Sequence, residues 1–513
     1  MNRNTSSHFS ASDNKINIGR SKFDRNSWFK TSMNFGDLIP FYVDEILPGD
    51  TFDMKTSLVA RMSTPIYPVM DNAYLDTYYF FVPARLLWEH WKEFNGENNT
   101  NAWASTFNQP IPSFNLLDEI GMLPAPFSLA DYFGLPTYTD SQSEGNRAVE
   151  VSALPFRAYQ LIWNEWFRDQ NLQQPLLIHT SDTVTDEERE KFMEVLKVNK
   201  FHDYFTSALP APQKGPAVLI PGLNDLVVNN IYDDDPIWNP DAVGKTDYPP
   251  TGYQTMTIDA LRTAFQIQKL LWRDGNGGTR YTEILRSHFG VVSPDGRLQR
   301  PEYLGGKRIP ITMNQVIQQS QGGQYDTNST PLGNAGAISK TVDSFDGFSK
   351  SFTEHGYLIG VCCARTDHTY QQGINRLWTR RNRFDFYYPE LANIGEQPIL
   401  NKEIYVQGRD EDEEVFGYQE AWAEYRYRPS YVTGALRSQY DQSLDAWHYG
   451  DYYTSLPRLS AGWISEPLEN VNRTLAVQGS ERNHDQLIID FYFDLTCTRP
   501  MPVYSVPGLV DHF

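Results

Sequence analysis

Cysteine is scarce in this chain, with three residues among 513, at Cys362, Cys363 and Cys497. So few thiols exclude a disulfide framework and suit a reducing compartment. Apolar runs long enough to cross a bilayer are absent, and the opening residues, MNRNTSSHFSASDNK, contain no apolar signal segment. These absences predict a soluble protein, not a membrane protein, that is made and kept in a cytoplasm.

Motifs of common enzymes are also missing. The GKT at 244–246 has Asn239 where a phosphate-binding loop needs glycine, and the GNGG at 275–278 leads to Arg280 where a dinucleotide fingerprint needs its last glycine. The sequence shows neither a nucleophile elbow nor a zinc-protease helix. We therefore expect neither enzymatic activity nor a cofactor.

One group of residues has the atom types of a zinc site but the wrong geometry. Cys362 and Cys363 lie in an apolar run between His355 and His368. Neighbouring side chains of a strand point to opposite faces, so both thiols cannot bind one ion without distortion. The aspartates at 233–235 also lack the spacing and glycine of a calcium loop. No metal site is predicted.

Positive charge is in short supply, because 44 Lys and Arg face 64 Asp and Glu, for a net charge of −20. Residues 1–31 are the exception, with six basic and two acidic residues. A basic arm on an acidic body can reach toward nucleic-acid phosphates. Solvated disorder, or a clamp that docks apolar side chains on a neighbouring subunit, is an alternative. The candidate contacts with single-stranded DNA on an inner surface are Arg3, Lys15, Arg20, Lys22 and Arg25.

The abundant residues predict a protein rich in strands and turns. Aromatic residues make up 14% of the chain, and there are 32 Pro and 34 Gly. Strands are predicted at 73–83, at 357–365, where the apolar run suits a strand covered on both faces, and at 487–498, where apolar and polar residues alternate. Helices are predicted at 154–170, from Ile258 to the GNGG at 275–278, and at 280–289.

Three segments have the composition of surface loops. Residues 217–257 are rich in Asp and Pro, residues 320–348 in Gly, Asn, Ser and Asp, and residues 410–414 read DEDEE. The first is predicted to be an exposed insertion, with the acidic triplet and a nearby tryptophan as candidate protrusion residues. These are Asp233, Asp234, Asp235 and Trp238.

Arginine alternates with aromatic residues in GINRLWTRRNRFDFYY (373–388) and in EYRYRPS (424–430). Fixed positive charge beside π-faces suits the phosphates and bases of a single strand. The same pairing also occurs in subunit interfaces, or with the abundant carboxylates, and that alternative stays open. The candidate residues are Arg376, Trp378, Arg380, Arg381, Arg383, Arg426 and Arg428.

Long blocks in order along the chain resemble one protein family. They include RSKFDRNSWFKTSMNFGDLIPFYVDEILPGDTF, TPIYPVMDNAYLDTYYFFVPARLLWEHWKEF, LLWRDGNGGTRYTEILRSHFG, RTDHTYQQGINRLWTRRNRFDFYYPE and RPMPVYSVPGLVDHF. The chain is similar to the major capsid protein of gokushovirus-type Microviridae, small bacteriophages with circular single-stranded DNA. The resemblance implies a single domain over 1–513, an eight-stranded antiparallel jelly roll with large loop and helical insertions. It weakens in 217–257, which resembles a variable insertion that projects from the shell.

The same resemblance implies a function and partners. The chain would form a T=1 icosahedral shell around the genome, in the virion, after assembly in the host bacterial cytoplasm. Its partners would be further copies of itself, single-stranded DNA, a small basic DNA-binding protein, an internal scaffolding protein, a pilot protein and a host surface receptor. Two alternatives remain, a carbohydrate-binding jelly roll and a glycoside hydrolase.

The closing segment RPMPVYSVPGLVDHF (499–513) combines prolines with apolar side chains that water disfavours. Proline lowers the entropy that an extended tail loses when it docks. We expect the tail to pack between subunits or on the inner surface, or to fold back on its own subunit.

Overall fold

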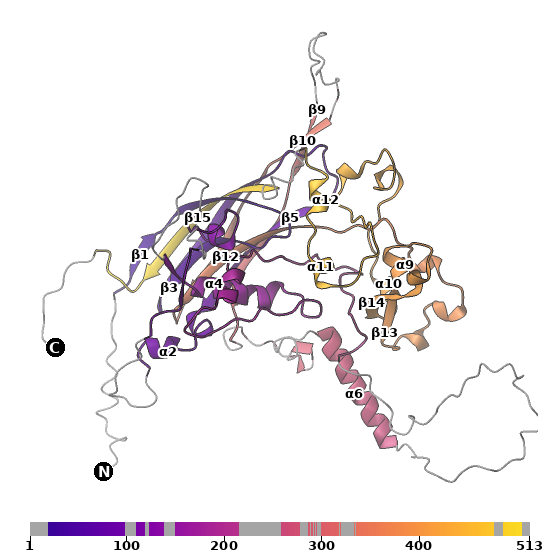
Figure 1. The fold of residues 1–513 in the computed structure, drawn as a ribbon, viewed down its shortest axis with the longest axis horizontal. Coiled ribbons are helices and arrows are strands. Elements are labelled where there is room, and N and C mark those ends of the chain that lie inside the picture. Colours follow the sequence, from indigo (N-terminus) through magenta and orange to yellow (C-terminus); the bar gives the residue numbers. More distant parts are fainter. Residues whose placement is uncertain are drawn as a thin grey trace, which may run out of the picture.

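Two antiparallel sheets form the centre of the computed structural model (Figure 1). The structure describes residues 19–97, 109–117, 123–137, 149–214, 258–277, 286–287, 289–290, 292, 294, 299–317, 319, 333, 335–476 and 486–504. Among these residues, no helix is long and apolar enough to cross a membrane. The strands come mostly from the two ends of the chain, and the helices and loops between them cover the sheets.

The first sheet has the strand order β1–β15–β4–β11, and β2 also pairs with β15. The predicted alternation in β15 is confirmed, because every second side chain from Leu487 to Cys497 is buried and those between them are partly or fully exposed. β4 alternates in the same way, so one face of this sheet faces the core. The bounds are β1 Ser21–Asp24, β2 Ser27–Met33, β4 Thr51–Met62, β11 Thr341–Ser351 and β15 Leu487–Arg499.

The second sheet has the order β3–β12–β5–β8. The prediction that 357–365 is a strand covered on both faces is confirmed, since ten of the eleven residues of β12 are buried. Gly306 allows β8 to approach β5, because a Cβ atom there would lie 2.0 Å from the carbonyl oxygen of Thr77. The bounds are β3 Ile39–Ile46, β5 Ala73–Pro83, β8 Glu302–Pro310 and β12 Gly356–Thr366.

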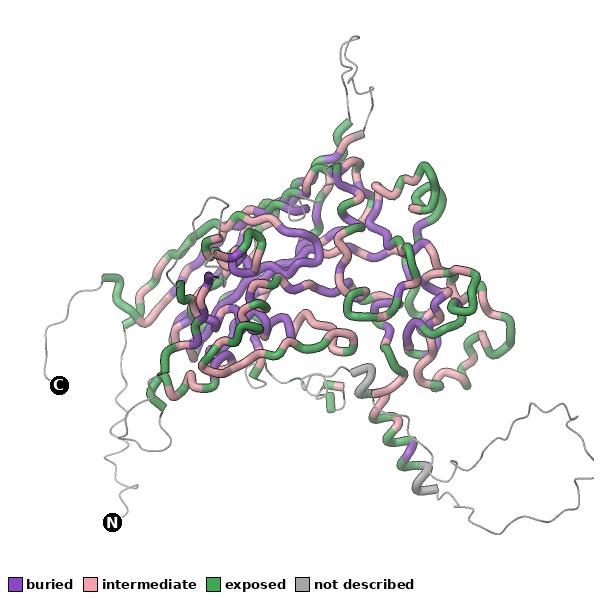
Figure 2. The backbone as a smooth tube through the Cα atoms, in the orientation of Figure 1, coloured by how far each residue is buried: buried purple, intermediate pink, exposed green. Residues whose placement is uncertain are grey.

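The main hydrophobic core lies between the inner faces of the two sheets (Figure 2). Phe41 of β3 stacks on Phe491 of β15 with ring centroids 4.6 Å apart. A 2.6 Å hydrogen bond between Thr56 of β4 and Tyr79 of β5 satisfies two buried hydroxyls across the sheets. Each fully buried Phe stabilises the fold by roughly 1.5–3 kcal/mol.

A second core covers the outer face of the second sheet. Its main element is α4 (Leu154–Ile162), which has Pro155 in its first turn and continues as a π-helical segment, Trp163–Phe167. The predicted helix at 154–170 is therefore confirmed. Cys362 belongs to the main core and Cys363 to this second core, so the two thiols do point to opposite faces.

A third cluster lies beside the sheets and is built from residues 204–208 and 370–463. It contains the two-stranded sheet of β13 (Glu396–Leu400) and β14 (Val415–Glu420) and several short helices (Figure 1). These helices are α9 Asn401–Ile404, α10 Ala423–Arg426 and α11 Ala461–Ile464.

Buried charges join this third cluster to the second sheet. His368, two residues beyond β12, bonds to Asp451 at 3.1 Å and to Glu466 at 2.9 Å. Lys200 lies 3.1 Å from the same Asp451 carboxylate. These four side chains are at most 3% exposed, and with a protonated histidine their formal charges cancel.

The prediction of a surface loop over 320–348 is wrong for its second half. Residues Ala335–Ser339 form β10, which pairs with β9 (Met313–Ile317), and β11 begins at Thr341. The two-stranded ribbon of β9 and β10 extends away from the sheets (Figure 1). Hydrogen bonding to β4 and inward packing of Phe348 stabilise β11 despite its weak strand-forming composition.

The helix predicted from Ile258 is confirmed as α6 (Ile258–Gly277), whose described side chains are mostly exposed (Figure 2). The helix predicted at 280–289 falls mostly outside the described residues. The other helices are α2 Trp91–Phe94, α3 Leu129–Tyr132, α5 Asp186–Lys191 and α12 Glu469–Asn472, and a short sheet pairs β6 Ser113–Asn115 with β7 Glu150–Ser152.

Candidate assembly surface

The structure brings together the two arginine-rich segments predicted from sequence, 373–388 and 424–430, which we name the arginine–aromatic surface. Short 3-10 helices at Arg376–Trp378 and Arg383–Asp385 give the first segment its turns, and α10 carries the start of the second. The Arg380 guanidinium lies 4.4 Å from the ring centre of Tyr425, which links the two segments directly.

Two of the predicted arginines are internal anchors. Arg376 lies 2.9 Å from Glu403, and Arg380 lies 3.1 Å from Glu424. The two arginine side chains are only 13% and 10% exposed, so each guanidinium charge is balanced mainly by a glutamate of the same chain. A contact of either with DNA would need the ion pair to open, which makes them poor candidates for phosphate binding.

Burial and charge compete at Glu403. Burial raises the pKa of this carboxyl, while the Arg376 guanidinium and a 3.1 Å hydrogen bond from Tyr204 act in the opposite direction. Burial, together with the nearby Glu403 charge, also raises the pKa of Tyr204 far above its usual range, so the phenol remains a donor. The partners Glu403 and Glu424 were not predicted, because the acids of this chain are too numerous to single out a pair.

The aromatic side chains of the same segments face solvent. Trp378 is 78% exposed and Phe384 is 74% exposed, and four more rings are about half exposed. Water disfavours so many apolar rings on one surface, and such a patch marks an interaction site. The six rings are Trp378, Phe384, Phe386, Tyr387, Tyr425 and Tyr427.

The remaining predicted arginines are exposed around these rings. Arg381, Arg383 and Arg428 lie at the surface, and Arg383 lies 5.1 Å from the ring centre of Tyr388. Arg426 forms an ion pair with Glu420. Positive charge beside exposed rings suits a carboxylate-bearing protein surface as well as a nucleic acid strand, so both predictions remain.

The acidic turn predicted at 410–414 lies on the same cluster of short helices. Its described acids are exposed except Asp412, for which the prediction of a solvated side chain is wrong. The Asp412 carboxylate accepts hydrogen bonds from the backbone N–H groups of Gln407 and Gly408, at 3.0 and 2.7 Å. The Asp412 carboxylate therefore stabilises the turn through hydrogen bonds to the backbone.

The second half of the predicted N-terminal arm is part of the first sheet. Lys22 is exposed on β1, opposite Thr498 of β15. Arg25 pairs with Asp44, at 3.1 Å for one of two contacts, and Arg20 is exposed just before β1. Lys22 and Arg20 can meet a ligand on this side, whereas Arg25 has a partner of its own.

Several predicted features lie outside the described residues. These are Arg3 and Lys15, the whole of 217–257 with Asp233, Asp234, Asp235 and Trp238, and residues 505–513 of the tail. The described start of the tail, 499–504, leaves Val503 and Tyr504 60% and 81% exposed.

Comparison with known proteins shows the family of the whole chain. Residues 12–509 match the family described as "Capsid protein (F protein)". The chain belongs to this capsid family. It is 40% identical to the "Capsid protein VP1" of Bdellovibrio phage phiMH2K, with 97% of each chain covered. It is 37% identical to the proteins of the same name from Chlamydia phage 1, with 96% of each chain covered, and from Spiroplasma virus 4, with 93% covered.

The comparisons confirm the resemblance to gokushovirus-type Microviridae and the prediction of a structural protein rather than an enzyme. The chain is a major capsid protein of the virion, and it acts by self-assembly. Because a capsid protein contacts other copies of itself, the exposed rings of the arginine–aromatic surface are candidates for such a contact.

Proposed function

We propose that this capsid protein forms a closed T=1 icosahedral shell, one chain in each asymmetric unit, around a circular single-stranded DNA genome. The domain would be an eight-stranded jelly roll. The strand orders β2–β15–β4–β11 and β3–β12–β5–β8 support it, because strands that follow each other along the chain alternate between facing sheets in several places.

The observation that carries the proposal is the arginine–aromatic surface. The largely buried Arg376–Glu403 and Arg380–Glu424 pairs anchor the two segments that carry the six exposed rings. A preformed surface loses little conformational entropy on binding, and Trp, Tyr and Arg contribute most of the energy in interfaces. A second copy of the chain is the proposed occupant, since a closed shell needs head-to-tail contacts that complete a rotation.

Other partners follow from charge. A chain with a net charge of −20 repels a packaged polyanion, so a small basic DNA-binding protein would complement it. The basic arm, 1–31, would lie on the inner face with Arg3, Lys15, Arg20 and Lys22 toward DNA. An internal scaffolding protein and a pilot protein would assist assembly in the host cytoplasm, and the insertion 217–257 would present acidic residues to a host receptor.

Electron microscopy of the protein, purified after co-expression with its scaffolding protein, tests this proposal. Closed particles of one size are expected. Monodisperse single chains that bind saccharides would instead favour the carbohydrate-binding alternative, and hydrolysis of a polysaccharide would favour the glycoside hydrolase.

A further inference from the structure

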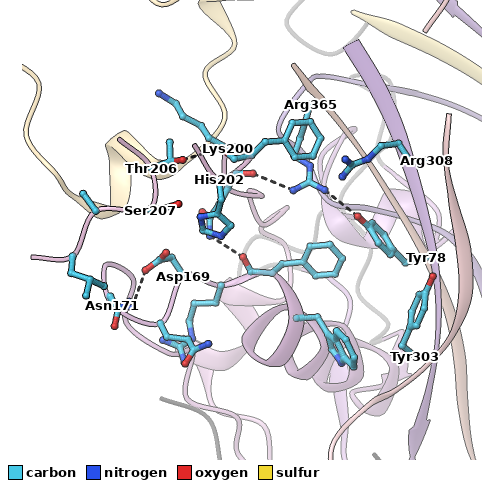
Figure 3. Close-up of a pocket in the computed structure, with 18 of the residues that line it drawn as sticks. Tyr78, Asp169, Asn171, Lys200, His202, Thr206, Ser207, Tyr303, Arg308 and Arg365 are labelled. Carbon is cyan, nitrogen blue, oxygen red and sulfur yellow. Dashed lines mark hydrogen bonds between the residues drawn. The ribbon is translucent and has the colours of Figure 1, made fainter. Parts of the chain in front are cut away.

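A pocket of about 800 Å³ lies between the outer face of the second sheet and the third cluster (Figure 3). Its walls come from β5, β8 and β12, from the end of the π-helical segment Trp163–Phe167, from residues 199–209 and from Gln419 of β14. None of the described residues that line it belongs to the arginine–aromatic surface. The volume is large enough for several side chains of a peptide.

Two arginines on one wall of the pocket share a single carboxylate. Arg308 donates to Asp76 at 2.8 and 3.2 Å, and Arg365 donates to the same carboxylate and, at 3.0 Å, to the hydroxyl of Tyr78 (Figure 3). Both guanidinium groups lie 4.2 Å from the ring centre of Phe201. Because one carboxylate balances only one of the two charges, this wall keeps an excess positive charge that a second carboxylate can balance.

The other charged side chains of the lining do not cancel this excess. Lys200 lies 3.1 Å from Asp451, and Arg168 is followed by Asp169, the one acidic residue of the described lining. The pocket is therefore positive on a chain whose net charge is −20. Such a site favours an anionic group of a partner.

Two buried polar atoms at the pocket lack a hydrogen bond. The Oδ1 atom of Asn199 and the Nε atom of Arg365 have no partner among the described residues, and Asn199 is only 9% exposed. The first atom needs a donor and the second an acceptor, and native proteins rarely leave buried polar groups in this state. A peptide backbone offers both, through its N–H and C=O groups.

Aromatic side chains form the opposite part of the lining. The π-helical turn that ends α4 places Trp166 and Phe167 at the pocket, beside the 40% exposed Tyr303. Turns of this kind often occur at functional sites. Rings that stay accessible to solvent gain stability when apolar side chains cover them. The pocket therefore suits a peptide that carries one carboxylate between apolar side chains.

The closing segment of this chain has that chemistry. Asp511 is the one acidic residue in 499–513, and the apolar residues Leu509, Val510 and Phe513 surround it. Alternate side chains of an extended peptide share one side, so Leu509, Asp511 and Phe513 would face the pocket together. The prolines of the segment lower the conformational entropy that it loses when it docks.

The tail starts far from the pocket of its own chain. Arg499 donates at 2.7 Å to the carbonyl oxygen of Glu45, which pairs with Tyr357 near the start of β12. Arg365 lies eight residues further along that strand, roughly 26 Å away. The described tail, 499–504, leaves the sheets at the end opposite the third cluster (Figure 1), and residues 505–513 span at most about 32 Å.

To enter the pocket of its own chain, the tail would have to reverse its direction, cover this length and pass round the second sheet. A neighbouring copy in a shell can present the same pocket without such a detour. A contact of this kind is head-to-tail, since the tail of one copy meets a different surface of the next, and such contacts close into rings.

We infer that this pocket binds residues 509–513 of a neighbouring copy. The Asp511 carboxylate pairs with Arg308 and Arg365. Leu509 and Phe513 pack against the aromatic lining, and the tail backbone satisfies Asn199. The inference rests on the proposed function, because a shell brings the copies together, and it adds a contact distinct from the arginine–aromatic surface.

Fluorescence anisotropy of a labelled peptide, residues 499–513, added to the full-length chain tests the contact on separate subunits. The peptide ends in an amide, so Asp511 carries its one carboxylate. Arg308→Gln in the chain removes one cation and leaves Asp76 paired with Arg365. Asp511→Asn in the peptide removes the charge from the other side. Each change should weaken binding about tenfold, the factor that one charge-assisted hydrogen bond supplies.

The two changes together show whether these groups meet. Arg308→Gln combined with Asp511→Asn should weaken binding little more than either change alone, because both remove the same contact. Effects that multiply to about a hundredfold would contradict the assigned pair. Arg437→Gln, at an exposed arginine outside the pocket, is the matched control and should bind the peptide like the parent chain.

A second pocket variant and a competitor make the result specific. Ser207→Tyr fills the pocket from an exposed position and should also weaken peptide binding. Equal affinity of the parent, Arg308→Gln and Ser207→Tyr chains would overturn the inference. Thymidine monophosphate should not displace the peptide; displacement at lower concentrations than unlabelled peptide requires would assign the pocket to nucleic acid and contradict the proposal.

Photocrosslinking in assembled particles tests whether the contact joins two copies. A chain with p-benzoylphenylalanine in place of Phe513 should, on irradiation, give linked pairs of chains whose link lies in residues 163–171 or 199–209. The same photoreactive residue in place of Leu177, which is 68% exposed and outside the pocket lining, should not link to these segments. Links within one chain would show that the tail folds back on its own subunit and would contradict the inference.

Particle counting separates this inference from the proposed shell. Closed particles formed by a chain that does not bind the peptide would overturn the tail contact alone. Peptide binding by a chain that never forms closed particles, even with its scaffolding protein, would support the pocket contact and contradict the proposed function.

Discussion

Arg380 and Glu424 lie 3.1 Å apart, and neither side chain is more than 10% exposed. Their ion pair joins residues 44 positions apart and brings the ring of Tyr425 under the guanidinium. The exposed rings of the arginine–aromatic surface thus rest on a buried electrostatic contact. We therefore expect stability and assembly to be coupled at this point.

Replacing Arg380 by Ala should destabilise the isolated subunit. The change leaves Glu424 buried without its main cation, which costs about 3 kcal/mol when a buried pair is broken. Arg381→Ala is the matched control, since Arg381 is exposed, and it should change the free energy of unfolding by less than about 0.5 kcal/mol. Urea unfolding of both variants measures the difference. Equal stability would mean that the pair does not anchor the surface.

The charge on His368 should make stability fall at alkaline pH. Burial lowers the pKa of this imidazole, but the Asp451 and Glu466 carboxylates outweigh it and raise the pKa to about 10. A pKa raised on folding adds stability that is complete below the unfolded value, about 6.5, and is lost as the pH rises toward 10. The free energy of unfolding should therefore decline by at most about 1.4 kcal/mol per pH unit in that window.

Unfolding measured from pH 6 to pH 9.5 tests this prediction, with His368→Gln as the comparison. The variant should be less stable at pH 6, because Asp451 and Glu466 lose a shared cation, and its stability should depend less on pH. A parent chain with a flat profile over this range would show that His368 is neutral in the folded protein.

The strands that follow a simple rule could be predicted from sequence. A strand covered on one face alternates apolar and polar residues, as in β15, and a strand covered on both faces is apolar throughout, as in β12. Both patterns can be seen in the sequence of the strand itself. β11 could not be predicted, since TVDSFDGFSKS has the composition of a loop. Its conformation depends on pairing with β4, which is distant in the sequence.

The position of the candidate surface could be predicted from the sequence, but which of its arginines form internal ion pairs could not. The alternation of arginine and aromatic residues located it, but nothing local distinguishes Arg376 and Arg380, which are largely buried, from Arg381 and Arg383, which are exposed. That distinction depends on Glu403 and Glu424, which tertiary folding brings to the arginines. The pocket beside Asp76 has the same origin, since its walls come from segments spread over more than 300 residues.

Neutralising the basic arm should lower the amount of packaged DNA. The variant replaces Arg3, Lys15, Arg20 and Lys22 by Gln and keeps Arg25, because Arg25 pairs with Asp44. Each lost phosphate contact should reduce the dependence of DNA binding on salt by about one unit of slope. The ratio of absorbance at the nucleic-acid and protein maxima in purified particles measures the DNA content.

Arg189→Gln with Lys191→Gln, on α5, is the control for this effect of charge and should package normally. Shells should form with both sets of changes. Normal packaging by the arm variant, or ready cleavage of the arm by protease added to intact particles, would leave the clamp as the role of residues 1–31.

Deleting the acidic insertion should spare folding and impair attachment to the host. Gln268, ten residues into α6, donates a hydrogen bond to Gln213 and so ties the chain before the insertion to the helix that follows it. A short Gly/Ser bridge in place of 217–257 then changes the loop-closure cost little. Circular dichroism and melting temperature should match the parent, and adsorption to host cells should fall. A deletion that yields insoluble chains would show that the segment contributes to the core.

The most direct test of the account is hydroxyl-radical footprinting of Trp378 and Phe384 in free subunits and in assembled shells. Both rings are more than 70% exposed in the single chain and should be oxidised rapidly there. In shells they should be protected several-fold, because a second copy covers them, while Leu177, which is 68% exposed and lies outside this surface, reports the general change in accessibility. Equal oxidation of Trp378 and Phe384 in subunits and shells would contradict the claim that the arginine–aromatic surface is an interface between copies.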